Sequence, residues 1–474
     1  MSKSNQDIFK KISAFRITHS ELIILRFKCC YGIIKIFNRK RSDYVKNFIG
    51  AKNILEKKKK YIMPCLGHFY KEPPQFVKGD MQYLYDVDGK KYLDCYAGVS
   101  VINCGHCNQE IISKMIDQIQ NLQHVCNIYL TENFVNLAEK LAEVTPGDLQ
   151  KSFFCSTGTE ANEGALLLAS IYTKSSEFIA LQSGLHGRTK LTMSLTGIGM
   201  WRTDPNPVGG INFAPNPYCY RCPLGKKYPE CDLECANKIE EIIKTATSGK
   251  PAALIAESIQ GNAGIVVPPK NYFKRVKEIL EKYNALLIID EVQTGFARSG
   301  KMFAIENFDV VPDIMSIAKA LGNGQPISAF ISTAKIADTY TRPGASTLGG
   351  NPVSSVAGLA VLDYIENHNL MKNAYERGEQ LKNGLKELAK RHKIIGDVRG
   401  LGLMIGAEFI HTDKSPAFNE LDQVLEQLKD RGFIIGKNGV GRNVMAFQPP
   451  LVITENNVNE ILNAIDLVLT ENNF

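Results

Sequence analysis

The stretch ALLIIDEVQTG, residues 285–295, places a carboxylate at the end of an uninterrupted apolar run. Such a run is typical of a strand that is buried on both faces of a parallel sheet. Asp290, at the end of this strand, must be paired or hydrogen-bonded, because an isolated buried charge is costly. Three kinds of partner remain open at this point: a protonated ring nitrogen, a basic side chain and a metal ion.

Short apolar runs and helical patterns alternate on both sides of this stretch. We expect further strands at residues 151–155, 178–182, 252–257, 313–317 and 327–332, and helices at 133–144, 160–174 and 272–283. Alternation of this kind predicts an α/β fold with a mostly parallel central sheet and helices on both faces. Ligands bind beyond the carboxyl ends of the strands in such sheets, so the residues that follow each run are candidates for chemistry.

The pattern changes near residue 370, where long charged helices at 373–391 and 417–431 bracket short strands near 398–409 and 444–447. This part predicts a smaller α+β domain, and a length of 474 residues suits a large domain with a smaller one. We predict a basic N-terminal extension at 1–60, an N-terminal segment of the small domain at 61–110, a large cofactor-binding domain at 111–370 and the C-terminal small domain at 371–474.

The positive charge of the chain is confined to its N-terminal extension. Residues 1–60 hold 16 Lys or Arg and four Asp or Glu, a net of +12, so the remainder carries −5 of the total of +7. The overall pI therefore gives no argument for nucleic-acid binding. The apolar stretch 22–37 is interrupted by Arg26, Lys28 and Lys35, so we expect no transmembrane segment.

The cysteine content predicts a reducing compartment. The chain has 12 Cys and lacks a secretory signal of the usual shape. We therefore expect a cytoplasmic protein, with organelle targeting by residues 1–60 as the alternative. A solvated helical extension, an amphipathic membrane-surface segment and a targeting peptide are the three interpretations of these residues.

Two further segments follow expected strands. Ser156-Thr157-Gly158-Thr159 joins a strand to a helix, where free N–H groups suit a phosphate, although an ordinary helix cap has the same pattern. Lys319 directly follows the strand at 313–317 and precedes a Gly-rich loop. A lysine in apolar surroundings has a lowered pKa and serves as an amine nucleophile and proton carrier.

Six motifs occur in an order that resembles the class III (ω-amino acid) aminotransferases of pyridoxal-phosphate fold type I. They are STGTEANE at 156–163, HGRT at 186–189, IDEVQTGF at 289–296, PDI with AKALG at 312–322, TLGGNP at 347–352 and VRGLG at 398–402. The resemblance runs from about residue 62 to the end of the chain. It implies pyridoxal 5′-phosphate as cofactor and a homodimer with shared active sites.

The resemblance also implies roles for single residues. Lys319 would hold the cofactor through a Schiff base and move a proton between substrate and cofactor, and Asp290 would keep the pyridine nitrogen protonated. Gln293 would bond the phenolic oxygen and Val292 would pack on the ring. The remaining cofactor contacts would be Thr157, Gly158 and Thr159 at the phosphate, Leu185, His186 and Glu257 near the ring, and Thr347 at the phosphate of the neighbouring subunit.

Arg399 would hold the substrate carboxylate, a bidentate task suited to a guanidinium, although a structural arginine before a Gly turn is the alternative. Two positions depart from the family pattern. Leu185 replaces an aromatic residue that stacks on the ring, which is worth about 0.5–1.5 kcal/mol. Asn262 stands where the 4-aminobutyrate branch has a Glu that pairs with the arginine. This favours relatives that use glyoxylate, pyruvate, β-alanine or taurine-like amines.

Cys219, Cys222, Cys231 and Cys235 form a C-x2-C-x8-C-x3-C segment that the resemblance does not explain. Such spacing permits tetrahedral zinc or an iron–sulfur centre, but the last two spacings are irregular and a thiol-rich loop is the alternative. We assign no metal ligand.

The predicted function is transamination from an ω-amino or β-amino acid, or a related amine, to a 2-oxo acid. The sequence names neither substrate. A racemase, epimerase or lyase on the same fold, which needs the same Lys319 and Asp290, is one alternative. A non-catalytic scaffold protein is the other, although the joint presence of Lys319, Asp290, Gln293 and the phosphate turn argues against it.

Overall fold

The computed structural model describes residues 48–474, which fall into two compact units divided after Gly67. The first unit holds α3 (Ala51–Tyr61), which buries none of its residues and has three lysines in its last turn. The hypotheses on residues 1–47 lie outside the described residues. None of the helices within 48–474 is both long and apolar enough to cross a membrane.

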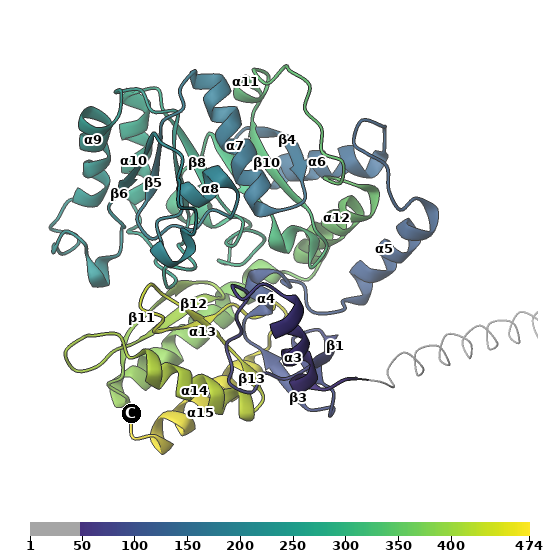
Figure 1. Cartoon of the computed structure of the whole chain (residues 1–474), viewed down its shortest axis with the longest axis vertical. Helices are drawn as coiled ribbons and strands as arrows, with labels where there is room; N and C mark the ends of the chain where they lie inside the picture. The colour runs from purple at the N-terminus through teal and green to yellow at the C-terminus, as the bar shows by residue number, and fades with distance from the viewer. Residues whose placement is uncertain (1–47) are drawn as a thin grey trace, which may run out of the picture. The chain divides into compact units, whose positions relative to one another are not determined.

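The second unit is built on a seven-stranded sheet with the order β4-β10-β9-β8-β7-β5-β6 (Figure 1). Its strands are β4 (Leu149–Cys155), β5 (Phe178–Leu181), β6 (Ile211–Ala214), β7 (Ala253–Glu257), β8 (Leu286–Asp290), β9 (Ile314–Ile317) and β10 (Ser328–Thr333). Five neighbouring strands, from β9 to β6, are parallel, and β10 is antiparallel to both β9 and β4. The predicted mostly parallel sheet is confirmed.

Alternate side chains of β8 enter two different cores, which explains why helices cover both faces of the sheet. Leu287 and Ile289 belong to one apolar cluster, whereas Leu286 and Ile288 belong to the other. The surrounding helices are α5 (Gln109–Asn121), α6 (Glu132–Val144), α7 (Gly158–Thr173), α8 (Lys190–Ser194), α9 (Glu234–Ala246), α10 (Tyr272–Lys282), α11 (Ala334–Ala337) and α12 (Pro352–Asn367).

Two four-stranded sheets make up the smaller lobe of this unit. One has the order β1-β2-β3-β13 and the other β11-β12-β15-β14. Their strands are β1 (Phe76–Asp80), β2 (Tyr83–Asp86), β3 (Lys91–Asp94), β11 (Ile395–Leu401), β12 (Met404–Phe409), β13 (Phe433–Ile434), β14 (Gly436–Asn438) and β15 (Val444–Phe447). With them lie α4 (Ala97–Ser100), α13 (Leu370–Arg391), α14 (Phe418–Asp430) and α15 (Glu455–Glu471).

β2 and β3 form an antiparallel hairpin. β3 also pairs in parallel with β13, so residues from the start and the end of the unit share one sheet. The boundaries at 110 and 370 remain predictions.

Short single-turn 3-10 helices complete the unit: η1 (Gly199–Trp201), η2 (Cys219–Arg221), η3 (Ala304–Phe308) and η4 (Lys319–Gly322). Two of them matter for the site. η4 begins at Lys319, separated by one residue from the end of β9, and η2 begins at the first cysteine of the Cys-rich segment.

Candidate active site

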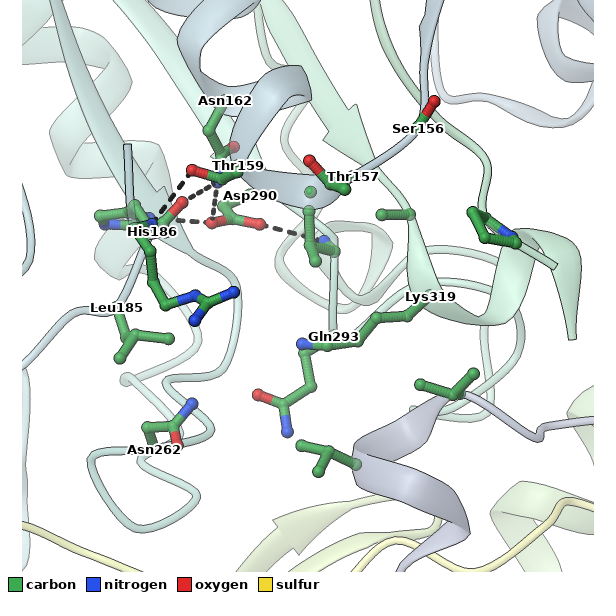
Figure 2. A pocket seen from close by; sticks show the side chains of 18 of the residues that line it. Ser156, Thr157, Thr159, Asn162, Leu185, His186, Asn262, Asp290, Gln293 and Lys319 are labelled. Atoms are coloured by element: carbon green, nitrogen blue, oxygen red, sulfur yellow. Dashed lines mark hydrogen bonds and ion pairs between the residues drawn. The ribbon is translucent and has the colours of Figure 1, made fainter. Parts of the chain in front are cut away.

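A cavity of about 630 Å³ lies beyond the carboxyl ends of the parallel strands (Figure 2). Ten of the twelve predicted site residues line it. They are Thr157, Gly158, Thr159, Leu185, His186, Glu257, Asp290, Val292, Gln293 and Lys319. Glu257 and Asp290 end β7 and β8, and the other residues lie in segments that follow β4, β5, β8 and β9, so the sheet brings all ten together at one edge.

Lys319 has a strained backbone and a partly buried side chain. Its φ is +46°, in the left-handed region that residues with a side chain rarely adopt. Burial lowers the pKa of Lys319, against the opposing effect of Asp290 and Glu257. A lowered pKa increases the fraction of free amine, which is the nucleophilic form. Strain of this kind clusters at functional sites, where the surrounding fold must maintain it.

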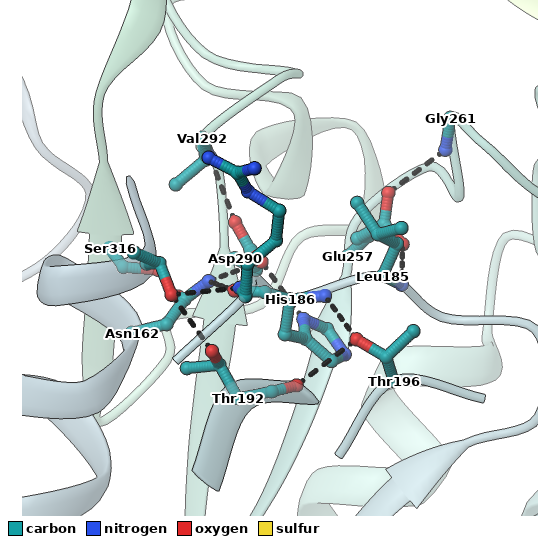
Figure 3. A network of polar contacts seen from close by, with 12 residues as sticks. Asn162, Leu185, His186, Thr192, Thr196, Glu257, Gly261, Asp290, Val292 and Ser316 are labelled. Atoms are coloured by element: carbon teal, nitrogen blue, oxygen red, sulfur yellow. Dashed lines mark hydrogen bonds and ion pairs between the residues drawn. The ribbon is translucent and has the colours of Figure 1, made fainter. Parts of the chain in front are cut away.

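Asp290 is held by three donors in a network shown in Figure 3. Asn162 Nδ2 donates to Asp290 Oδ2 at 2.8 Å, His186 Nδ1 to the same oxygen at 2.9 Å, and the Val292 backbone N–H to Oδ1 at 3.0 Å. Asn162 is itself fixed, because Ser316 Oγ donates to its Oδ1 and its Nδ2 also donates to the His186 carbonyl. The carboxylate therefore has a fixed orientation at the edge of the cavity.

His186 contributes to the site through Asp290. Its Nδ1 carries the proton that Asp290 accepts, while its Nε2 is buried and has no hydrogen-bond partner within residues 48–474. The His186 ring thus helps to fix the orientation of the Asp290 carboxylate.

The phosphate turn is a well-formed helix start. Thr157 caps α7, and the Glu160 carboxylate accepts from the Thr157 backbone N–H at 2.8 Å and from Ser156 N–H at 3.1 Å. The first N–H groups of a helix lack internal partners, and the positive end of the helix dipole lies there. A side chain at Gly158 would meet Val292 Cγ1 at 2.7 Å, so only glycine fits between the helix start and Val292.

The hydroxyl of Thr159 is occupied by contacts within the chain. Thr159 Oγ1 lies 3.0 Å from Thr189 Oγ1 and 2.8 Å from Thr192 Oγ1, and it accepts from Arg188 N–H at 3.1 Å. It fastens the end of the HGRT motif and α8 to α7. A phosphate contact from Thr159 would therefore come from its backbone N–H.

Glu257 connects two walls of the cavity. Its Oε1 accepts from the Leu185 backbone N–H and its Oε2 from the Gly261 backbone N–H, both at 2.9 Å. Burial raises the pKa of Glu257 to about 7; His186 opposes this rise and Asp290 adds to it. The carboxyl group thus fixes the backbone of Leu185 and the turn that carries Asn262.

Gln293 lies beside the same turn. Its Nε2 donates to Gln448 Oε1 at 2.9 Å, and an added side chain at Gly261 would meet its Oε1 at 2.0 Å. Gly261 therefore has to be glycine for Gln293 to keep its place in the cavity wall.

Arg399 and Thr347, the other two predicted residues, are not among the residues that line the cavity. Thr347 is exposed. Arg399 on β11 is 11% exposed and is already paired: its Nη1 lies 2.7 Å from Asp397 Oδ2 and 2.9 Å from Glu408 Oε2. Its Nε and Nη2 donate to the Gly264 carbonyl at 3.0 and 2.6 Å.

Fourteen further residues line the cavity outside the predicted set, and three of them bear on its charge and shape. Arg188 lines the cavity, and its side chain has no hydrogen bond or ion pair within residues 48–474. Arg188 belongs to the HGRT motif, so its position two residues after His186 could have indicated that it lies at the site. Val99 lines the wall with φ +69°, which is unusual for a β-branched residue, and Trp201 also borders the cavity. Val99 lies in the non-helical part of α4 and Trp201 ends η1, and such short turns leave no periodic pattern.

The four cysteines of the Cys-rich segment line one small cavity of about 20 Å³ and form no disulfide. Across residues 48–474, no group of three or more His, Cys, Asp or Glu side chains is placed to hold a metal ion. The geometry therefore adds no support to a zinc or iron–sulfur centre in this segment.

The residues of the large cavity fit pyridoxal phosphate. A helix start that admits only glycine at 158 suits the phosphate, and the fixed Asp290 carboxylate suits a protonated ring nitrogen. Lys319 reaches the same cavity as the amine that the aldehyde needs (Figure 2). The fold and the site together define an enzyme that depends on this cofactor.

The chain belongs to the class-III aminotransferase family, whose model matches residues 70–469. It is a pyridoxal-phosphate-dependent transaminase, as its motifs predicted. It is 40% identical to alanine–glyoxylate aminotransferase 2 homolog 2, mitochondrial, of Arabidopsis thaliana, over 88% of this chain and 87% of that one. It is 38% identical to a leucine/methionine racemase of Thermococcus litoralis, over 86% and 94%.

A solved structure supports the same conclusion. The amine transaminase from an uncultivated Pseudomonas species, in its PLP-bound form, matches with a TM-score of 0.81 and 28% identity, over 87% of this chain and 98% of that one. The predicted fold class is confirmed by this similarity.

Proposed function

We propose that the enzyme transfers the amino group of an ω- or β-amino acid to a small 2-oxo acid, with glyoxylate as the first acceptor to test. One observation carries the donor class: Arg188 offers an unpaired guanidinium to the cavity, while Arg399 is occupied by carboxylates of the chain itself. A donor whose carboxylate is distant from its amine would bind Arg188 and would not need Arg399. The name of the Arabidopsis relative supports glyoxylate.

The assigned residues divide the work as follows. Bound pyridoxal phosphate supplies an aldehyde and an electron-withdrawing ring. Lys319 would hold the cofactor through Nζ and, once displaced by the substrate amine, would carry the proton at the reacting carbon. Asp290 would hold a proton on the ring nitrogen, with His186 and Asn162 fixing its position. Val292 and Leu185 would enclose the ring, and Gln293 would donate to its phenolic oxygen.

The phosphate would be bound by the backbone N–H groups of Gly158 and Thr159 and by the Thr157 hydroxyl. Glu257 would act at a distance from the chemistry, since its two hydrogen bonds position Leu185 and Gly261. Arg399 would bind the carboxylate of the 2-oxo acid after leaving Glu408.

A donor-by-acceptor panel on the full-length holoenzyme tests this proposal. We expect β-alanine with glyoxylate to be among the best pairs, and Lys319→Ala to lower the rate by roughly 10²–10⁴-fold. Full activity of Lys319→Ala would remove the catalytic assignment. Arg188→Lys, which keeps the charge and loses the fork, should raise KM for the ω-amino donor.

Incubation with a donor alone separates transamination from racemisation, the activity named for the Thermococcus relative. Accumulation of the pyridoxamine form of the cofactor supports transamination. Loss of optical activity of an amino acid without that form would instead identify a racemase.

We also propose a homodimer with shared sites. Thr347 is exposed and does not line the cavity of its own chain, and Ile128, Tyr129, Leu130 and Leu348 are exposed apolar side chains at more than half of their full area. A second copy that covers them would bring Thr347 to the partner's phosphate. Sedimentation analysis should give twice the chain mass, and a fully active monomer would contradict the proposal.

A cytoplasmic location is proposed on the chemistry of the thiols, since all ten cysteines within residues 48–474 are free. Cell fractionation with an antibody against the natural protein tests it. Recovery with an organelle would instead assign a targeting role to residues 1–60.

A further inference from the structure

Arg221 is a second guanidinium in contact with the carboxylate that holds Arg399. Arg221 Nε lies 2.5 Å from Glu408 Oε1, while Arg399 Nη1 lies 2.9 Å from Glu408 Oε2. The Tyr218 hydroxyl donates to the same Oε2, and the ring of Tyr218 lies 4.6 Å from the Arg399 guanidinium carbon. Glu408 itself is only 3% exposed, so two arginines share one buried carboxylate.

Tyr218 and Arg221 come from the start of the Cys-rich segment, the part of the sequence that had no assigned purpose. Arg221 is the last residue of η2 and stands between Cys219 and Cys222. The Cys-rich segment therefore contacts β12 of the smaller lobe, through Glu408.

Glu408 would keep Arg221 as an ionic partner when Arg399 moves away. The four side chains Asp397, Glu408, Arg399 and Arg221 are balanced in charge. If Arg399 moves to a substrate carboxylate, Glu408 keeps Arg221 and Tyr218 as partners. Without Arg221, the same movement would leave a buried carboxylate with only a phenol, and an unpaired buried charge is strongly unfavourable. Arg221 thus lowers the cost of releasing Arg399.

Space for this separation exists beside the pair. A second cavity, of about 290 Å³, is lined by Tyr218, Arg221, Glu408 and Asn443, together with the loop around Gln182. Arg221 Nη2 is buried and has no partner within residues 48–474, so Arg221 has a free donor with which to keep Glu408 after a shift.

We infer that Arg221 is a positioning residue that sets how readily Arg399 leaves Glu408, and hence the affinity for substrates with a carboxylate on the reacting carbon. The inference rests on the proposed role of Arg399 as the anchor of that carboxylate. It assigns a specificity function to the Cys-rich segment.

The test is the half-reaction of the full-length holoenzyme with a single donor, followed through the cofactor absorbance. L-alanine carries its carboxylate on the reacting carbon, whereas β-alanine does not. Arg221→Gln should raise the half-saturating concentration of L-alanine by about tenfold and change that of β-alanine by less than about twofold. Arg221→Lys, the matched control, keeps the charge and should stay within about threefold of the parent for both donors.

The Glu408→Gln variant supplies a second measurement, whose expected result would not follow if Arg221 had only a structural role. Glu408→Gln should lower the half-saturating concentration of L-alanine, because Arg399 loses a competing partner. The double variant Arg221→Gln/Glu408→Gln should return most of the affinity that Arg221→Gln loses. Should Arg221→Gln not yield soluble protein, Arg221→Met takes its place, and unchanged binding of L-alanine by that variant overturns the inference. Weaker binding of L-alanine by Glu408→Gln overturns it as well.

Arg399→Gln separates the two possible failures. If it leaves L-alanine unaffected, the proposed role of Arg399 fails. If Arg399→Gln weakens L-alanine but Arg221→Gln does not, or if Arg221→Gln weakens both donors equally, only the inference on Arg221 fails.

Discussion

Two buried glutamates, Glu257 and Glu408, are connected to the same turn at residues 261–265, Glu257 through the Gly261 N–H and Glu408 through Arg399, yet their partners are opposite in kind. Glu257 accepts only two backbone N–H groups, and burial raises its pKa to about 7. Burial also acts to raise the pKa of Glu408, but Arg399, Tyr218 and Arg221 outweigh it and hold that pKa below its usual range. Burial alone therefore does not decide the charge of a carboxyl group; the ionic partners do.

The difference separates two parts of the site. On the Glu257 side the cavity is open, and Arg188 and Lys319 face the space where cofactor and donor would bind. On the Glu408 side, Arg399 is already paired with two carboxylates of the chain, those of Asp397 and Glu408. One part is prepared for a ligand, and the other must rearrange before it can bind one.

Glu408→Gln should produce the largest loss of stability. It leaves Arg399, 11% exposed, with Asp397 as its only carboxylate partner, and breaking one partner of a buried pair costs about 3–5 kcal/mol. Arg221 is 35% exposed, so solvent screening makes the stability that is lost with the Arg221–Glu408 ion pair smaller. The urea midpoint of the apoenzyme should fall well below that of Glu257→Gln, measured in parallel. Equal midpoints for the two variants would contradict the comparison.

Glu257 should give the apoenzyme a pH-dependent stability. Because its pKa is about 7 when folded and 4.5 in the reference state, the folded chain binds more protons between these values. Its contribution is complete below about pH 4.5 and is lost as pH rises through 7, at most about 3 kcal/mol in total.

Glu257→Gln should flatten this part of the profile, as seen in the unfolding midpoint between pH 5 and 7.5. Glu408 has the opposite sign, since its pKa is lowered: its contribution is present above the usual pKa and is lost only in acid. An unchanged slope in Glu257→Gln would show that Glu257 is ionised throughout.

Leu185→Phe should have the smallest effect. Its backbone N–H is held by Glu257, so the position of the ring-face residue is already fixed. An aromatic side chain would add about 0.5–1.5 kcal/mol of stacking on the cofactor. Cofactor affinity should tighten by about two- to tenfold in equilibrium titration. Leu185→Ile is the control for a change of shape without an aromatic ring, and weaker binding by the Phe variant would refute the assumed ring face.

Much of the fold was predictable because buried parallel strands are continuous apolar runs. The runs before Asp290, Glu257 and Lys319 are β8, β7 and β9 in the structure. α12 was not predicted, since it is buried on most of its circumference and shows no polar face at helical spacing. β6 was missed as a short, half-buried edge strand.

The sequence by itself determined the residues at the strand ends, because a parallel sheet places all of its carboxyl ends on one edge. Thus Asp290, Lys319 and the phosphate turn could be placed in one site from their order alone. Only the tertiary structure decided that Arg399 is paired while Arg188 is not. The reason is distance along the chain: the partners of Arg399 include Glu408 on the next strand and, through it, Arg221 from a distant turn, and no local pattern encodes such contacts.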